Sequence, residues 1–192
     1  MIRLSAARWR QIRECVQVIF SEAEDILPIV DENDDVIGTA RRRIVHARAL
    51  RHRSAHVVVF NTAGRLLIQL RSAAKDLYPL YWDVSAGGHV GPDESYEQAA
   101  RRELREELGL TGELKFVRKT PASKVTDWEF TCLYELTTDE PPRPNSHEIE
   151  GYEFVLPSPL IEQAVSGRRH MTPALVGTIL FYTSPERLLD GN

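Results

Sequence analysis

The chain contains few cysteines, with Cys15 and Cys132 the two among its 192 residues. Their separation matches no metal-ligand spacing, and two cysteines are too few to build a disulfide scaffold. We therefore interpret each of them as a small buried hydrophobic residue. Neither a disulfide-stabilised fold nor a zinc site is expected from this pattern.

Long hydrophobic runs and a strong charge imbalance are also lacking. No stretch of about 18 apolar residues occurs, so no membrane-spanning helix is expected. The formal net charge is −4, which does not favour broad electrostatic capture of nucleic acid. The first residues lack the apolar core of a signal peptide, and acidic residues interrupt their arginines. We therefore expect a cytoplasmic protein.

The length and composition fit one globular domain with an extension. Hydrophobic residues make up 42% of the chain and charged residues 27%, which is ordinary for a soluble globular protein. We predict an N-terminal helical extension at residues 1–25, a single domain at 26–183 and a tail at 184–192.

Hydrophobic periodicity and turn signals predict a mixture of helices and strands. We expect an amphipathic helix at 6–24, a hairpin at 26–40 and a short basic helix or irregular segment at 41–51. A second hairpin is expected, with strands at 55–60 and 65–70 around a polar turn. The remaining expectations are strands at 82–86, 114–118, 128–136 and 152–156, an irregular proline-rich loop at 139–144, and closing helices at 159–166 and 173–181.

Residues 88–110 carry most of the chemical information. Positions 95–108 contain no proline or glycine and are rich in good helix formers. Positions three and four apart share a helical face, so Glu103, Glu106 and Glu107 are expected to converge within about one turn. Three close carboxylates repel one another unless a cation lies among them. A hard divalent ion such as Mg²⁺ or Mn²⁺ prefers these oxygen ligands.

The alternative interpretation of this segment is a solvated amphipathic helix, because Glu and Arg often cover protein surfaces. That interpretation explains the alternation with apolar residues but not the loop in front of the helix. Gly87-Gly88 and Gly91-Pro92 make a backbone that can approach a ligand closely. We therefore favour a binding site over a bare surface helix.

The same segment resembles the Nudix signature, in which glycine, Glu, Arg-Glu, Glu-Glu and glycine follow one another at fixed spacing. The resemblance implies an α+β fold, namely an α/β/α sandwich around a mixed β-sheet. It also implies a metal-dependent enzyme that cleaves a diphosphate linked to another group. The matching positions are Gly88, Glu94, Arg102, Glu103, Leu104, Glu106, Glu107, Gly109 and Leu110.

The resemblance implies a role for each polar residue of the signature. The three glutamates at 103, 106 and 107 would coordinate Mg²⁺ or Mn²⁺, with the backbone carbonyl of Gly87 as a further ligand. One of these glutamates could instead act as the general base, and the sequence does not say which. Arg102 would pair with a glutamate and hold the cluster in place. Glu94 would brace the loop.

Residues outside the signature resemble one branch of the family, the isopentenyl-diphosphate-isomerase-like Nudix proteins. In that branch an Arg and a Lys four residues later contact the diphosphate of the substrate, and Arg71 and Lys75 have that spacing. The alternative is a pair of surface cations. Some relatives also use a later acid as base or extra ligand, and Glu148 sits in a comparable place, with Glu150 and Glu153 as competing candidates.

The same comparison argues against isomerase chemistry. True isomerases resemble a pattern with a catalytic cysteine two residues before a metal-binding histidine, and here His89 is present but Gly87 replaces the cysteine. Glycine offers neither the acid nor the base that proton transfer at carbon requires. Of two upstream histidines that isomerases use for metal, His52 matches one and Val45 occupies the position of the other.

Histidines 46, 52, 56 and 89 could still gather around a metal. We interpret His46 and His56 as exposed residues of a basic segment. The role of His52 is left open, and His89 is either a metal ligand or a part of the substrate loop.

The leading hypothesis is a divalent-metal-dependent hydrolase acting on a nucleoside diphosphate derivative or a similar small molecule. The alternatives are a non-catalytic Nudix module that senses a ligand, and a relative of isopentenyl-diphosphate isomerase. A small-molecule diphosphate is the expected partner, and a homodimer stays open.

Overall fold

The computed structural model describes residues 25–184. The helix expected at 6–24 and nearly all of the tail lie outside the described residues. No described helix has the length and apolar character that crossing a membrane requires.

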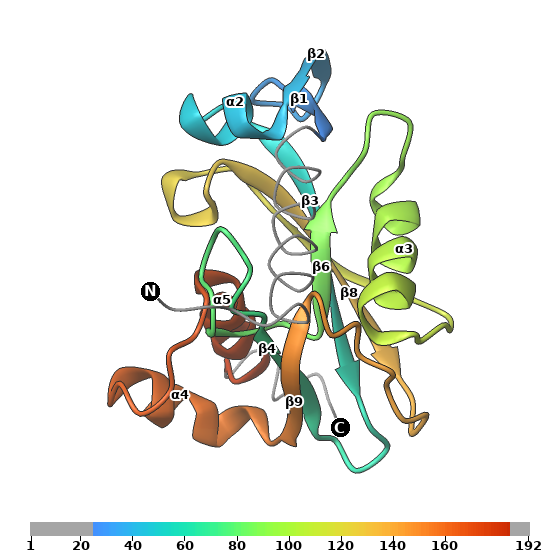
Figure 1. Cartoon of the computed structure of the whole chain (residues 1–192), viewed down its shortest axis with the longest axis vertical. Helices are drawn as coiled ribbons and strands as arrows, with labels where there is room; N and C mark the ends of the chain where they lie inside the picture. Colours follow the sequence, from blue (N-terminus) through green and yellow to red (C-terminus); the bar gives the residue numbers. More distant parts are fainter. Residues whose placement is uncertain (1–24, 185–192) are drawn as a thin grey trace, which may run out of the picture.

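A mixed β-sheet forms the centre of the described structure (Figure 1). Its strands are β3 (His52–Phe60), β4 (Leu66–Arg71), β5 (Trp82–Asp83), β6 (Ala86–His89), β7 (Lys115–Thr120), β8 (Glu129–Thr137) and β9 (Ile149–Val155). They run in the order β5–β4–β3–β8–β7, with β6 paired to β3 and β9 paired to β4. β3 and β8 are parallel and the other pairs are antiparallel.

Helices cover both faces of this sheet. α3 (Tyr96–Leu108) packs on one face, and α4 (Pro157–Val165) and α5 (Pro173–Tyr182) belong to the core on the other. Because side chains alternate along a strand, Val57 and Val59 join the core under α3, whereas Val58 joins the opposite core. The predicted α/β/α sandwich around a mixed sheet is confirmed.

A separate hairpin precedes the sheet, made of β1 (Ile26–Val30) and β2 (Val36–Arg41), and leads into α2 (Arg42–Ala47). The turn of the hairpin is anchored by Asp34, which is buried. Its carboxylate accepts hydrogen bonds from Arg53 Nε at 2.7 Å and from the Tyr96 hydroxyl at 2.9 Å. These bonds hold the hairpin against the beginnings of β3 and α3.

The boundaries of α3 follow from its capping residues. The Ser95 side chain accepts the Gln98 backbone N–H at 3.2 Å, and the Gln98 side chain accepts the Ser95 N–H at 2.8 Å. This reciprocal pair is a capping box. Gly109 ends the helix with a φ of 64°, a left-handed conformation that glycine adopts without steric cost.

The prediction of one continuous strand at 82–86 was wrong. The segment expected as a single strand at 82–86 is divided into β5, which pairs with β4, and β6, which pairs with β3. Ser85 lies between β5 and β6, and its side chain hydrogen-bonds to backbone groups of β3 and β4. Its hydroxyl donates to the Leu67 carbonyl at 2.6 Å and accepts the Val59 N–H at 2.8 Å.

The other expected elements are present with small shifts at their ends. The basic segment at 41–51 contains the short helix α2, and the proline-rich loop at 139–144 is irregular. α4 begins at Pro157, two residues before the predicted start, because proline is well suited to the first helical turn. A short 3₁₀ turn, η1 (Lys124–Thr126), precedes β8.

The burial of Cys132 predicts low reactivity of its thiol. Burial raises the pKa of Cys132 to about 11 from an ordinary value of 9.0, and the thiolate is the reactive form. In a Cys15→Ser variant at pH 8, we expect Cys132 to react with a thiol reagent at least about 100-fold more slowly in the native protein than after guanidinium unfolding. Equal rates in the two states would contradict the placement of Cys132 in the core.

Candidate functional site

A cavity of about 1120 Å³ lies between the sheet, α3, α2 and α5. One wall is acidic and belongs to α3, and another carries residues of the β4–β5 connection and the start of α5. Charged residues from distant parts of the chain therefore face a common volume. They include Arg71, Lys75, Glu103, Glu106, Glu107, Glu129 and Glu148.

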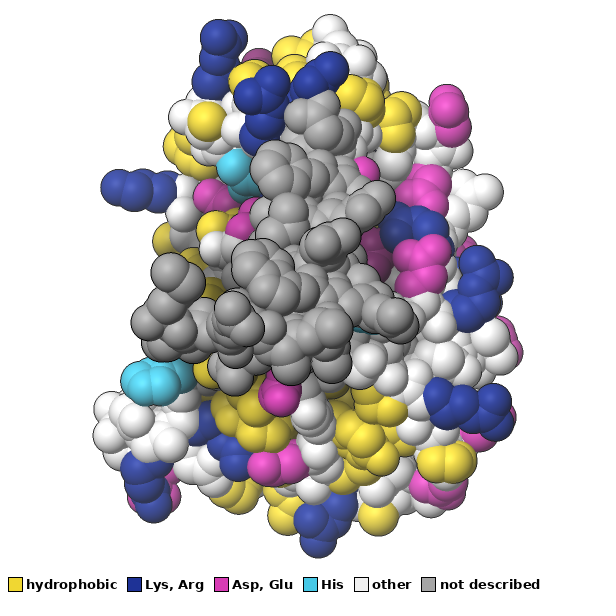
Figure 2. Space-filling view, viewed as in Figure 1, with side chains coloured by type: hydrophobic (Ala, Val, Ile, Leu, Met, Phe, Trp, Pro, Cys, Tyr) yellow, Lys and Arg dark blue, Asp and Glu magenta, His cyan; other side chains and the backbone are white. Residues whose placement is uncertain are grey.

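The three predicted glutamates line this cavity from a single turn of α3. Acidic and basic side chains lie next to one another on the side of the molecule that α3 forms (Figure 2). They differ in exposure, since the Glu106 side chain is 54% exposed and that of Glu103 14% exposed. Glu107 is buried. The three carboxylates of one helical turn therefore differ in solvent exposure, from half-exposed to buried.

Arg102 binds the acidic cluster and the loop in front of it. Its Nε and Nη2 atoms donate to the two carboxylate oxygens of Glu94 at 2.7 and 3.0 Å. Its Nη1 donates to Glu103 at 2.6 Å and, at 3.3 Å, to Glu106. Glu94 in turn accepts the Gly91 N–H at 2.9 Å, so the loop and the helix are joined through one guanidinium.

The glycine loop approaches α3 closely. A Cβ atom at Gly88 would overlap the Glu103 carboxylate, so a side chain at this position would displace that group. The Gly87 N–H donates to Glu107 Oε2 at 3.3 Å, and the Gln69 side chain donates to the same oxygen at 2.9 Å. Gln69 is a contact that the sequence pattern did not reveal.

Ionisation of the two more buried glutamates of the cluster is disfavoured. Burial first, and then the neighbouring charge of Glu103, raise the pKa of Glu107 well above its usual range. Burial also raises the pKa of Glu103, although Arg102 opposes this effect. A divalent cation fits such a cluster for two reasons. Its positive charge favours the ionised form of the carboxylates, and it binds their oxygens as ligands.

Lys75 and Arg71 both reach the cavity but have different partners. Lys75 forms an ion pair with Glu148. The Arg71 guanidinium donates to Asp83 at 2.9 Å and to the Leu77 carbonyl through Nε and Nη2. Three of its five N–H donors are used in these contacts.

The three later acids differ in position, and one of them lines the cavity. Glu148 lines the cavity, with its side chain 18% exposed. Glu150 is exposed on the surface, and Glu153 forms an ion pair with Arg169 at 2.9 Å. Glu148 is therefore the member of this group that faces the acidic cluster.

The space at Gly87 bears on the isomerase alternative. A Cβ atom there would lie 2.6 Å from Cδ2 of His56 and 3.2 Å from the Ala55 carbonyl oxygen. The His56 ring thus occupies the space that a side chain at position 87 needs. Glycine stands where the isomerases have cysteine, and the His56 ring fills the space that a cysteine side chain would need.

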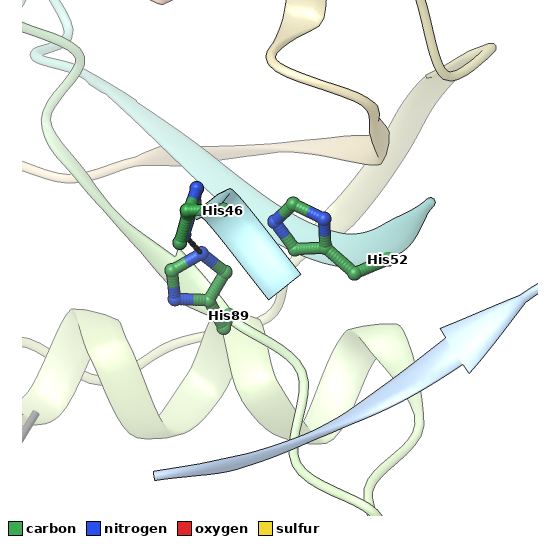
Figure 3. Close-up of side chains that lie close together, drawn as sticks. All are labelled: His46, His52 and His89. Carbon is green, nitrogen blue, oxygen red and sulfur yellow. Dashed lines mark hydrogen bonds between the residues drawn. The ribbon is translucent and has the colours of Figure 1, made fainter. Parts of the chain in front are cut away.

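The interpretation of His46 and His56 as exposed residues of a basic segment was wrong, because His56 is partly buried, and so is His46. The side chain of His46 is 18% exposed and forms a histidine cluster with His52 and His89, whose ring centroids lie 4.9 and 5.2 Å away (Figure 3). Val45, the position suggested by the isomerase resemblance, is buried. A helix turns successive side chains by roughly 100°, so α2 directs residue 46 rather than residue 45 to the cluster.

Glu129 and Asp127 are acids of this region that sequence reasoning missed. Glu129 lies 3.4 Å from the Nε2 atoms of both His52 and His89. Asp127 Oδ2 lies 2.9 Å from His46 Nδ1. The signal for Glu129 is the parallel pairing of β3 with β8, which places His52 opposite Glu129, and such pairing between distant strands is not visible in a single sequence.

Comparison with known proteins places the chain in a family. The NUDIX domain model matches residues 50–175. A Nudix hydrolase of Streptomyces coelicolor, itself uncharacterized, is 39% identical over 143 residues, covering 71% of this chain and 77% of the relative. A Nudix hydrolase of Deinococcus radiodurans is 35% identical over 150 residues, covering 76% and 86%. An isopentenyl-diphosphate Delta-isomerase of Aromatoleum aromaticum is 36% identical over 137 residues, covering 69% and 77%.

Solved structures agree with this placement. A crystal structure of a Deinococcus radiodurans protein superposes with a TM-score of 0.75 at 31% identity, covering 83% of this chain and all of the other. The NUDIX domain of NrtR from Shewanella oneidensis, complexed with ADP ribose, gives a TM-score of 0.54 at 14% identity and covers 79% and 98%. At that identity the second likeness concerns the fold alone.

The raised pKa of Glu107 predicts a pH-dependent gain in stability on its neutralisation. Below the ordinary value of 4.5, the carboxyl is protonated in both folded and unfolded chains, and Glu107→Gln should change little. As the pH rises above 4.5, the unfolded chain ionises first, and the free energy of unfolding of the wild type falls relative to Glu107→Gln. We expect the variant to melt at a higher temperature at pH 7 without added metal, and a lower melting temperature there would contradict the raised pKa of this buried carboxyl group.

Proposed function

The chain belongs to the Nudix family as a Nudix-type hydrolase, and from that premise we propose that it cleaves a diphosphate linkage in a nucleoside diphosphate derivative or a similar small molecule. We propose Mg²⁺ or Mn²⁺ as its cofactor. One observation carries the proposal: three carboxylates of one helical turn face a cavity that also contains Lys75.

The residues proposed to hold the cation are Glu103, Glu106 and Glu107, with the Gly87 carbonyl as a further ligand. The burial of Glu103 and Glu107, which raises the pKa of both carboxyl groups, supports this assignment, because a cation would favour their ionised forms. When bound, the cation supplies positive charge that offsets the charge of the diphosphate and makes water a better nucleophile.

Arg102 and Glu94 are proposed as positioning residues. The planar guanidinium grips Glu94 through two bonds and also contacts Glu103, which restricts the rotamers of both acids. A preorganised acidic cluster needs less rearrangement when the substrate arrives. This restriction also keeps the glycine loop close to α3.

Lys75 and Arg71 are proposed as contacts to the substrate phosphates, with His89 as a further substrate contact at the mouth of the loop. Lys75 pairs with Glu148 and lines the same cavity as the acidic cluster. Arg71 retains two N–H donors for an anion after its bonds to Asp83 and Leu77. Two cations that line one cavity suit a diphosphate, which carries charge on two adjacent groups.

The two alternative functions are less well supported. A ligand-sensing module has no need for a complete carboxylate set, whereas this chain retains every polar position of the signature. Isomerase chemistry needs a side chain at position 87, where the His56 ring takes up the space.

The hydrolase proposal is tested by a substrate panel and by Glu106→Gln. Nucleoside diphosphate derivatives, dinucleotides, sugar nucleotides and isopentenyl diphosphate are incubated with Mg²⁺ or Mn²⁺, and the products are quantified. We expect cleavage of a diphosphate linkage in at least one compound. Glu106→Gln should lower turnover about 1,000-fold, because charge stabilisation by a metal contributes several kcal/mol to lowering the barrier.

Glu97→Gln is the matched control, since Glu97 lies on the exposed side of the same helix and pairs with Arg101. Its turnover should equal that of the wild type. A folded Glu106→Gln protein with full activity would refute the assignment. Tight binding without any cleavage would favour the sensing module, and formation of dimethylallyl diphosphate would favour the isomerase.

The position of Glu148 predicts a difference between two neighbouring acids. Glu148→Gln should lower turnover about 100-fold, the usual scale for losing an acid–base group or an added ligand. Glu150→Gln, two residues away and exposed, should leave turnover unchanged. Equal turnover in these two variants, measured on the substrate found in the panel, would remove Glu148 from the mechanism.

A further inference from the structure

One face of the sheet forms a floor of the cavity, on which four strands place residues in rows. Gly87 of β6 lies opposite His56 of β3. His56 lies opposite Leu133 of β8, which in turn lies opposite Arg118 of β7. All of these residues line the cavity. The cavity therefore extends from the glycine loop across β3 and β8 to β7.

A second row runs beside the first and is polar throughout. The same four strands supply it, with His89, Ser54, Thr131 and Thr120 in that order across the sheet. Each of these residues lines the cavity. The hydroxyl oxygens of Ser54 and Thr131 are 2.8 Å apart and hydrogen-bonded. The floor thus offers hydroxyl groups to a ligand that lies along it.

This floor is longer than one diphosphate. Neighbouring strands lie about 4.8 Å apart, so three spacings separate the backbones of Gly87 and Arg118 by about 14 Å. The two phosphates of a diphosphate share a bridging oxygen and are much closer together. A ligand that occupies the whole cavity of about 1120 Å³ therefore has further groups that extend toward β7.

The β7 end of the cavity carries two cations, Arg118 and Lys124, that form no ion pair within residues 25–184. Lys124 belongs to η1, which lies against β8 and α5. The other Lys and Arg side chains of the cavity are paired with carboxylates, namely those of Arg42, Arg71, Lys75 and Arg102. Positive charge at the β7 end is thus available to a ligand.

An aromatic ring positions the Arg118 guanidinium. Its Cζ atom lies over the Phe181 ring of α5, 4.7 Å from the ring centroid. A stacked guanidinium contacts the ring through its face and keeps the N–H groups at its edge for hydrogen bonds. No described residue accepts a hydrogen bond from this side chain. Such a fork of N–H donors suits an anion with several oxygens.

We propose that Arg118 and Lys124 form a second anion site, which binds a phosphate on the ribose of the substrate nucleotide. This inference rests on the proposed function, because it places the cleaved diphosphate at the glycine loop. A ribose phosphate is separated from the diphosphate by the sugar, which matches anion sites at opposite ends of the floor. Its terminal oxygens suit a guanidinium fork together with an ammonium group. The site selects among nucleotides and takes no part in cleavage.

Two pairs of nucleotides test this site, because the members of each pair differ by one ribose phosphate. They are NADPH and NADH, and coenzyme A and dephospho-coenzyme A. Dissociation constants are measured calorimetrically with Mg²⁺ on the full-length Glu106→Gln protein, in which slow turnover preserves the ligand. In at least one pair, we expect the member with the ribose phosphate to bind about 10- to 100-fold more tightly, the range for hydrogen bonds between charged groups.

Substitutions in the same background assign this preference to the two cations. Arg118→Met removes the charge but keeps an unbranched side chain against Phe181, and Lys124→Ala removes an exposed cation. Each should weaken binding of the member with the ribose phosphate and leave the other member unaffected. Lys115→Met is the matched control, because Lys115 is an exposed cation of β7 that does not line the cavity. It should keep the full preference.

The binding measurement separates this proposal from the proposed hydrolase activity. A preference that disappears in Arg118→Met and Lys124→Ala supports the anion site, even if the wild type cleaves none of the four compounds. Equal affinities within both pairs, or no binding of any member, would overturn the site even for an active hydrolase. A preference that both variants retain would also overturn it.

Discussion

The grip of Arg102 on Glu94 is the interaction on which the site depends. It joins α3 to the glycine loop, because Glu94 also accepts the Gly91 N–H and the Arg102 Nη2 atom donates to the His89 carbonyl at 3.0 Å. The loop therefore cannot move without breaking charged hydrogen bonds, which are among the stronger ones in proteins. Through His89, the same guanidinium also helps to place the histidine cluster.

The acidic wall is a local conflict that the rest of the fold tolerates. Glu107 is buried, and burial disfavours its ionised form. Its hydrogen-bond partner Gln69 is neutral. A sequence optimised for stability alone would place an apolar or amide group there. Such conflicts are typical of functional sites, because the missing charge is left for a ligand to provide.

The central strand β3 connects the histidine cluster with the glycine loop that lies against the acidic wall. Its first residue, His52, belongs to the histidine cluster, and its following residues pair with β6, which carries the glycine loop. The parallel neighbour β8 brings Glu129 to the same end. The hairpin in front of β3, anchored through Asp34, delivers α2 and with it His46. The histidine cluster and the glycine loop therefore depend on how strands and a short helix converge at one end of the sheet.

What a single sequence determines here is local. The spacing of Glu103, Glu106 and Glu107 is enough to put them on one helical face. The turn residues predict the hairpins, and the run of good helix formers predicts α3. A cluster of histidines was one open alternative in the sequence, and local spacing did not decide which of them meet. His52 and Glu129 are neighbours because two distant strands pair in one register, and His46 joins them because α2 turns that side chain, not Val45, toward β3. Local periodicity is a property of consecutive residues, whereas strand register and helix docking are set by packing of the whole core, and only the tertiary structure decides them.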